Sequence, residues 1–364
     1  MDIYVLDGLN GVVDVISSFQ SCIWVPQYYG QNEFELVVNA SEKNVAALKP
    51  GAYLVRDEDI HPGQYSNVMV IQDYKLDFDT EKGWLLTLTG KGLKNDLLRR
   101  RIIWGQKVDD DITVEASIRK VLQYNCINPS EFNGARAIPS LVLEAQHQWT
   151  ERITMQTRGD NIAEWMEKIC TSYNYGWDIE IRKRSGNWVY RFFLYKGVDR
   201  TYNQSEVTPV IFSPEFDNLL SSSYQYNMGD FNNAALIGGE GSGTSQRTAS
   251  VGDTISGLNR YETYIDGSNV SSNGDIITEA TYTQMLKQYG QSQLDQTAYT
   301  QSFSGNIDSQ GLFKINQDYF LGDIVQIENE KGIKATPRII EIIYATDENG
   351  TSVVPTLSKW EVIE

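Results

Sequence analysis

A pattern of turn and strand residues occurs twice in this chain, far apart in the sequence. The first copy starts at Gly51, continues as the apolar run 52–55, and ends at a turn around Gly83. The second starts at Gly322, continues as 323–326, and turns at Gly350 after nearly the same length. A duplicated β unit explains this match, and a chance likeness of two unrelated β meanders is the alternative. The spacing alone leaves both open.

Period-two alternation predicts the strands within the first copy. One face of 68–79 is apolar and the other charged, as a half-buried strand requires; the apolar face is Val70, Tyr74, Leu76 and Phe78, and the other Asp73, Lys75, Asp77 and Asp79. The segment 80–83 has turn chemistry, and Trp84, Leu86 and Leu88 alternate after it. We therefore expect a β-hairpin. Another strand is expected at 33–38, with Phe34, Leu36 and Val38 on one face.

Helical periodicity appears after residue 92. Apolar stripes predict helices around Leu93–Leu98 and 114–122, and Asn161 followed by Glu164 has the spacing of a capping box. A further stripe, Tyr282, Met285, Leu286 and Tyr289, predicts a helix, whereas 242–253 is polar and Gly/Ser/Thr-rich and is expected to be a loop.

These patterns predict a mainly β fold with α+β parts. We expect a first β-barrel unit at 1–92, an α+β domain at 93–217, and a second, related β-barrel unit at 218–364. A helix-containing insert is expected at about 254–298.

The charge balance restricts the possible partners. Lys and Arg total 31 and Asp and Glu total 48, so the formal charge is −17. Gripping a nucleic-acid backbone requires clustered positive charge, so the composition argues against it. No stretch of about 20 apolar residues occurs, and the N-terminus lacks a signal-peptide pattern, so folding in the cytoplasm is expected.

The residue types that carry most catalytic and metal chemistry are scarce. Cys22, Cys126 and Cys170 are widely spaced, and we expect small buried side chains rather than disulfides or a zinc site. Two histidines leave little room for histidine-based catalysis. The acidic run 109–111 is expected to complement the dipole of the following helix rather than bind a cation. We expect no catalytic residue, no metal and no cofactor.

Two other functions fit some features of the sequence. With 48 acids, paired carboxylates for glycoside hydrolysis occur by chance, so a wall- or glycan-degrading enzyme in 93–217 is one alternative. The Tyr- and Asn-rich segments 172–175 and 224–227 suit a sugar-binding face, so a monomeric carbohydrate-binding module is the other.

The order of several short segments resembles the siphophage tail hub family, the relatives in Gram-positive phages of the central baseplate hub. The resembling segments span nearly the whole chain: Gly90-Lys91-Gly92-Leu93 through Leu97–Ile103, Arg158–Ile162, Ile211–Ser213 to Asn218-Leu219, Phe231–Ala234 to Gly238–Gly241, Leu258–Glu262 to Ile265-Asp266, and Tyr319–Val325. Each segment is loose, and their order and spacing make the resemblance specific.

The resemblance implies a homotrimer in which each chain supplies two similar β-barrels, giving a six-barrel ring that matches a six-fold tail tube. It implies as partners a distal tail or tail tube protein, a tape measure protein, and tip, fibre or receptor-binding proteins, with DNA only passing through. The expected location is the virion tail tip, assembled in the host bacterial cytoplasm. The chain stops at Glu364, soon after the second barrel, so no enzymatic activity is expected.

Four residues are structural candidates at barrel rims. Gly51, Asn218, Gly322 and Asp323 are of types that tolerate the unusual backbone angles of tight turns. We expect them to shape turns rather than to perform chemistry.

Overall fold

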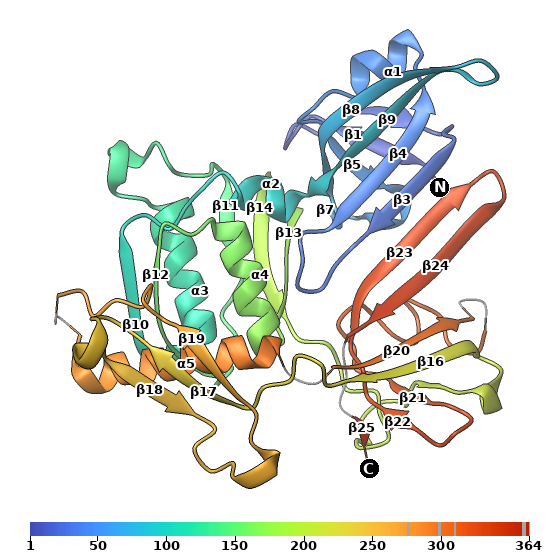
Figure 1. Ribbon diagram of the computed structural model, residues 1–364. Coiled ribbons are helices and arrows are strands. Elements are labelled where there is room, and N and C mark those ends of the chain that lie inside the picture. Colours follow the sequence, from blue (N-terminus) through green and yellow to red (C-terminus); the bar gives the residue numbers. More distant parts are fainter. Residues whose placement is uncertain (275–276, 298–299, 309–310, 359–361, 364) are drawn as a thin grey trace.

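The computed structural model describes residues 1–364 except 275–276, 298–299, 309–310, 359–361 and 364 (Figure 1). Strands dominate, and helices are gathered between and beside the sheets. The predicted mainly β fold class with α+β parts is confirmed.

The largest sheet has nine strands and curls into a half-barrel (Figure 1). Its order is β2-β1-β5-β8-β9-β4-β3-β23-β24. The strands are β1 (Ile3–Leu6), β2 (Val12–Ile16), β3 (Ser21–Val25), β4 (Glu33–Asn39), β5 (Tyr53–Arg56), β8 (Met69–Asp79), β9 (Gly83–Gly92), β23 (Ile339–Asp347) and β24 (Gly350–Leu357). The short helix α1 (Glu42–Ala47) follows β4. The C-terminal hairpin β23–β24 thus extends the N-terminal sheet, which the sequence did not predict.

The predicted hairpin is present as β8 and β9, and one of its residues lies on the other face from the one expected. The pairing shifts between Ile71 and Asp73, which marks a β-bulge. A bulge adds one residue to one strand and so reverses the alternation before it. Ile71, not Val70, therefore shares the face of Tyr74, and Val70 joins the core beneath the helical domain.

The α+β part packs helices on small sheets, as the helical stripes predict. Its elements are α2 (Leu93–Leu98), β10 (Gln106–Thr113), α3 (Val114–Leu122), β11 (Leu141–Leu143), β12 (Arg152–Arg158), α4 (Ile162–Tyr173), β13 (Gly176–Arg184) and β14 (Asn187–Tyr195). The side chains of Thr113 and Asn161 cap α3 and α4 by accepting backbone N–H bonds. Two strands from the first unit, β6 (Ile60–His61) and β7 (Gln64–Tyr65), extend the sheet of β11, β14 and β13.

Apart from β23–β24 and the sheet of β17, β18 and β19 (within 234–266), the C-terminal part has two small sheets among the described residues. One is β15 (Ile211–Phe212), β21 (Gln326–Glu328), β22 (Lys334–Ala335) and β25 (Val362–Ile363), and the other is β16 (Leu219–Asn227) paired with β20 (Thr300–Ile307). Buried side chains of this part, including Phe212 and Val325, share one apolar cluster with Trp24 and Leu36 of the N-terminal sheet. The two β units are therefore joined by a continuous core.

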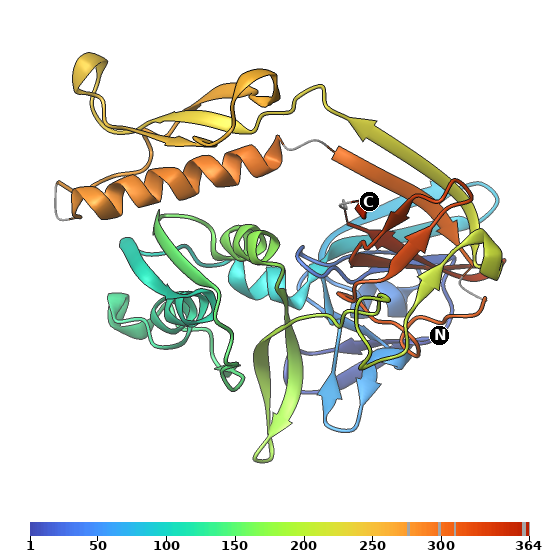
Figure 2. The same cartoon turned by 90° about the horizontal axis from the view of Figure 1, so that it is seen from below.

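A small α+β unit lies between β16 and β20 in the sequence and to one side of the β units in space (Figure 2). It consists of β17 (Ala234–Gly238), β18 (Thr248–Val251), β19 (Glu262–Asp266) and α5 (Glu279–Gln296). The predicted helix is present, but the prediction of a loop over 242–253 is wrong for β18, where Ala249 and Val251 are buried. Because β17 and β18 share a sheet with β19, this unit begins before residue 254.

Candidate assembly site

The repeated sequence pattern has a defined geometry in its first copy. Gly51 lies in a turn with φ +91°, a backbone angle that favours glycine. Its N–H donates to the carbonyl of Ile71 (2.7 Å), and the N–H of Ile71 donates to the carbonyl of Ala52 (3.0 Å). This pair of bonds fastens the turn before β5 onto the start of β8.

The second copy has the same pair of bonds. Gly322 has φ +96° and donates its N–H to the carbonyl of Ile339 (2.8 Å). The N–H of Ile339 donates to the carbonyl of Asp323 (2.8 Å). Gly51 and Gly322 thus occupy the same position, as do Ile71 and Ile339.

A β-bulge follows at the same place in both copies. The register shifts between Ile71 and Asp73 in β8, and between Ile339 and Glu341 in β23. Counting onward from the bulge pairs Asp79 with Asp347, and each of these closes its hairpin opposite a glycine, Gly83 or Gly350. Two unrelated meanders have no reason to share a turn, a bulge and a closing pair, so the geometry favours a duplicated unit.

Two of the four candidate turn residues are buried polar side chains with full sets of partners. The carboxylate of Asp323 is 2% exposed and accepts bonds from the Val198 N–H (2.7 Å), the Arg200 guanidinium (2.6 Å) and the Phe320 N–H (3.0 Å). Asp323 therefore ties the segment after β14 to the turn at Gly322.

The side-chain amide of Asn218 forms hydrogen bonds with the backbone through both its oxygen and its nitrogen. It is fully buried; its Oδ1 accepts from the Ser213 N–H and its Nδ2 donates to the Ile211 carbonyl, both at 2.8 Å. These bonds hold β15 against the start of β16.

The two β units meet where β3 pairs antiparallel with β23. Trp24 lies opposite Tyr344 in this pairing, and both side chains are buried. The guanidinium of Arg56, held by Asp59 at 2.7 Å, lies 4.1 Å from the centre of the Tyr344 ring. Burial lowers the pKa of Arg56, but Asp59 together with Tyr344 and Glu58 raises it by more, so the cation–π contact persists at any ordinary pH.

Tyr28 connects all three large parts of the chain. Its N–H donates to the Ile340 carbonyl (2.8 Å), and its hydroxyl donates to the Asn174 carbonyl (3.1 Å) and accepts from the Gly197 N–H (3.2 Å). Burial raises the pKa of Tyr28, so the hydroxyl keeps its proton. Sequence analysis did not single out Tyr28 or Arg56, because no local pattern distinguishes a residue whose partners lie far away in the chain.

An apolar face remains exposed at the far end of the β8–β9 hairpin. The exposed fractions are 46% for Tyr74, 42% for Leu76, 61% for Phe78 and 58% for Trp84. The rings of Phe78 and Trp84 lie 5.4 Å apart. We call these four side chains the hairpin patch.

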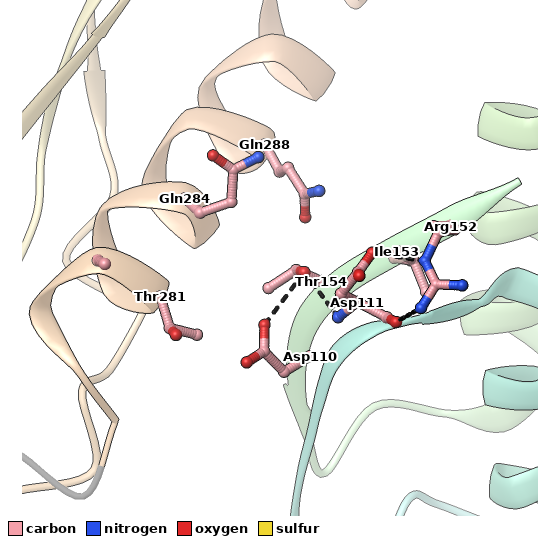
Figure 3. A pocket seen from close by; sticks show the side chains of 9 residues that line it. Asp110, Asp111, Arg152, Ile153, Thr154, Thr281, Gln284 and Gln288 are labelled. Carbon is pink, nitrogen blue, oxygen red and sulfur yellow. Dashed lines mark hydrogen bonds and ion pairs between the residues drawn. The ribbon is translucent and has the colours of Figure 1, made fainter.

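The acidic run 109–111 lies in β10 rather than at a helix start, and two of its residues, Asp110 and Asp111, border a cavity (Figure 3). Asp109 is buried, bound by Ser117 (2.6 Å) and Lys120 (2.5 Å) of α3, whereas Thr113 caps that helix. The cavity, of about 390 Å³, separates α5 from β10 and β12; its lining includes Asp110, Asp111, Arg152, Thr154, Gln284 and Gln288. Because Arg152 neutralises Asp111 at 2.6 Å, the cavity has little net negative charge to attract a cation.

Neither a metal-binding group nor a membrane-spanning helix is found among the described residues. No group of three or more His, Cys, Asp or Glu side chains there is placed to hold a metal ion. In the same part of the chain, no helix is long and apolar enough to cross a membrane. The three cysteines are buried and unbridged, as expected, and burial raises the pKa of the Cys22 thiol to about 12.

Family comparison covers almost the whole chain. A family model described as "Siphovirus ReqiPepy6 Gp37-like protein" matches residues 2–357. The chain belongs to this family. The resemblance to siphophage tail proteins seen in the sequence is thereby confirmed.

Solved structures show which fold this Gp37-like chain has. The tail protein from Neisseria meningitidis MC58 has 14% sequence identity and a TM-score of 0.55, covering 99% of this chain and 96% of its own. The 43 kDa tail protein of prophage MuSo2 from Shewanella oneidensis has 11% identity and a TM-score of 0.57, covering 99% and 98%. Prophage tail protein gp18 from Listeria monocytogenes EGD-e has 12% identity and a TM-score of 0.50, covering 99% and 95%. No curated protein matches the sequence.

At these identities the likeness concerns the fold. This Gp37-like chain has the fold of these phage tail proteins over 99% of its residues, and this stretch includes both copies of the repeat.

Proposed function

We propose that the protein is a structural hub of a phage tail tip, in which three copies form a ring of six similar β units between the tail tube and the tip. The observation that carries the proposal is the repeat of turn, bulge and closing pair at Gly51–Gly83 and Gly322–Gly350. A chain with two similar units converts three-fold into six-fold symmetry when three copies close a ring. Membership of the Gp37-like family and the tail-protein fold support this role.

The proposed arrangement divides the chain into the units 1–92, 93–217 and 218–364, with the small unit of β17, β18, β19 and α5 placed outside the ring. The α+β domain and the small unit decorate the ring or carry the tip. Partners are a distal tail or tail tube protein, a tape measure protein, and tip, fibre or receptor-binding proteins.

DNA passes through the ring without being held. The charge of −17 per chain supports this, because carboxylates on a channel wall repel phosphates and let the duplex slide. A ring structure with a neutral or basic channel wall would contradict this part of the proposal.

The first test is the mass of the purified chain by light scattering on a sizing column, over a range of concentrations. We expect about three times the chain mass of 41.2 kDa, followed by a ring with a central channel on imaging. A monomer at every concentration would contradict the trimer. Turnover of peptidoglycan or oligosaccharides by the purified protein would contradict the purely structural role.

A further inference from the structure

The two repeats differ at one strand edge. In the second repeat a neighbouring strand pairs with this edge near the end of β23, whereas among the described residues no strand pairs with the equivalent stretch of β8. In the second repeat, the end of β23 pairs antiparallel with β3, from Tyr344 opposite Trp24 to Asp347 opposite Ser21. Counting from the bulge, the equivalent stretch of the first repeat is Leu76–Asp79 in β8. There β9 occupies one edge, and β5 on the other side pairs only with Met69 and Val70. Within the described residues, no strand lies beside that edge at 76–79.

The side chains at equivalent positions show the same difference. Ile342 and Tyr344 of β23 are 1% and 7% exposed, and both belong to the apolar cluster that is shared with the N-terminal sheet. Their equivalents in β8, Tyr74 and Leu76, are 46% and 42% exposed. The unpaired backbone N–H and C=O groups of an open strand edge are a template for pairing with another chain, and an exposed apolar patch beside them marks an interaction surface. The hairpin patch is therefore the first repeat's version of a surface that is covered in the second.

In the second unit, β16 has the place that β3 has in the first unit. In the first unit, β9 is followed across the sheet by β4 and then β3. In the second unit β24, the equivalent of β9, contacts β20, and β20 pairs antiparallel with β16. The small unit occupies the connection between β16 and β20, where the first unit has the short loop 26–32.

Strand β16 has the surface that such a contact requires. Its sheet contains only β16 and β20 among the described residues, and Leu220 is 67% exposed. In Figure 1 the β8–β9 hairpin lies at the top of the molecule and β16 near the bottom, so one chain cannot bring them together. A second copy is required.

We propose that β16 of one copy pairs antiparallel with Leu76–Asp79 of β8 in the next copy and covers the hairpin patch. This junction repeats between copies the β3–β23 junction that exists inside each chain, and it rests on the proposed function. The two surfaces differ, so the contact is head-to-tail, and three such contacts alternate with three internal junctions to close a ring.

Photo-crosslinking of the full-length chain tests the junction directly. A p-benzoylphenylalanine replaces Phe78, which is 61% exposed, and irradiated samples are digested and analysed by mass spectrometry. We expect crosslinks between copies to the peptide that contains residues 219–227. The same reporter at Leu258, which is 98% exposed in the small unit, is the control and is expected to give none to that peptide.

A matched pair of substitutions gives a second measurement. Phe78→Asp is expected to lower the trimeric fraction at least tenfold, whereas Leu258→Asp leaves it unchanged, and equal circular dichroism shows that both variants keep the fold. Crosslinks from position 78 to any other part of a trimer, or a trimer that survives Phe78→Asp, overturn the junction and leave the hub proposal standing. A monomer with no crosslink between copies overturns both.

Discussion

The ring of Tyr28 lies where a side chain at Gly322 would begin. A Cβ built at position 322 would be 2.3 Å from Cε2 of Tyr28, far inside van der Waals contact. Tyr28 comes from the loop after β3, and Gly322 from the turn that begins the second repeat. The absence of a side chain at Gly322 therefore allows the loop of the first unit to pack on the turn of the second.

Substituting the two equivalent glycines separates backbone strain from packing. Gly51→Ala imposes only a positive φ, since no atom lies within 4 Å of the new Cβ, and we expect a loss of about 1–3 kcal/mol. Gly322→Ala adds the clash with Tyr28, for a further loss of about 1–3 kcal/mol. Denaturant unfolding of both variants measures the difference. Equal losses would show that the Tyr28 contact relaxes without cost.

Removing the charge of Asp323 should destabilise the chain. Asp323→Asn leaves the guanidinium of Arg200, which is only 14% exposed, without its carboxylate partner. We expect a loss of about 2–4 kcal/mol in the free energy of unfolding. The matched control is Asp111→Asn, whose ion pair with Arg152 is solvent-exposed and is expected to contribute less than about 1 kcal/mol. Similar losses in the two variants would contradict the importance of the buried pair.

Asn218 is expected to stabilise the buried turn that leads from β15 into β16. Asn218→Ala leaves the Ser213 N–H and the Ile211 carbonyl without side-chain partners in a buried place, and we expect a loss of about 2–4 kcal/mol. Asn10→Ala, which removes one exposed bond to Asp7, is the control and is expected to be nearly neutral. A melting temperature for Asn218→Ala close to that of the native chain would argue against this role.

Glu151 should make part of the stability depend on pH. The hydrogen-bonded ammonium of Lys196 lowers the pKa of Glu151 from 4.5 to about 2. The folded state thus binds fewer protons than the unfolded state between these values, so the stabilisation is complete above about pH 5 and lost as the pH falls toward 2.

Glu151→Gln is therefore expected to be less stable than the native chain at pH 6, with the gap closing by about pH 2. Denaturant unfolding across this range measures it. Because the carboxylate is 38% exposed, the gap should also shrink in high salt. Lys196→Gln should weaken the same pH dependence, because it removes the largest cause of the lowered pKa, and a gap independent of pH would contradict the assignment.

The local elements follow from the sequence because each depends on a short-range period. The face of Phe34, Leu36 and Val38 in β4 and the capped helix after Asn161 were predicted from spacing, and the structure confirms both. The bulge after Ile71 was not, because an extra residue in a strand leaves the alternation readable on either side of it. The strand β18 was not predicted because its segment is polar and rich in Gly, Ser and Thr, as loops are. Its residues Ala249 and Val251 are buried by packing against α5, which the sequence does not show.

For the candidate assembly site, the positions of the two repeats and of Gly51 and Gly322 could be predicted from the sequence, since a turn with positive φ favours glycine. Three features depend on how the chain folds in space: β23 pairs with β3, Gln27 contacts Glu341 across 314 positions, and Tyr74 is open where Ile342 is covered. Strand partners are chosen by the fit of surfaces that come together on folding, and such a choice leaves no periodic trace along the chain.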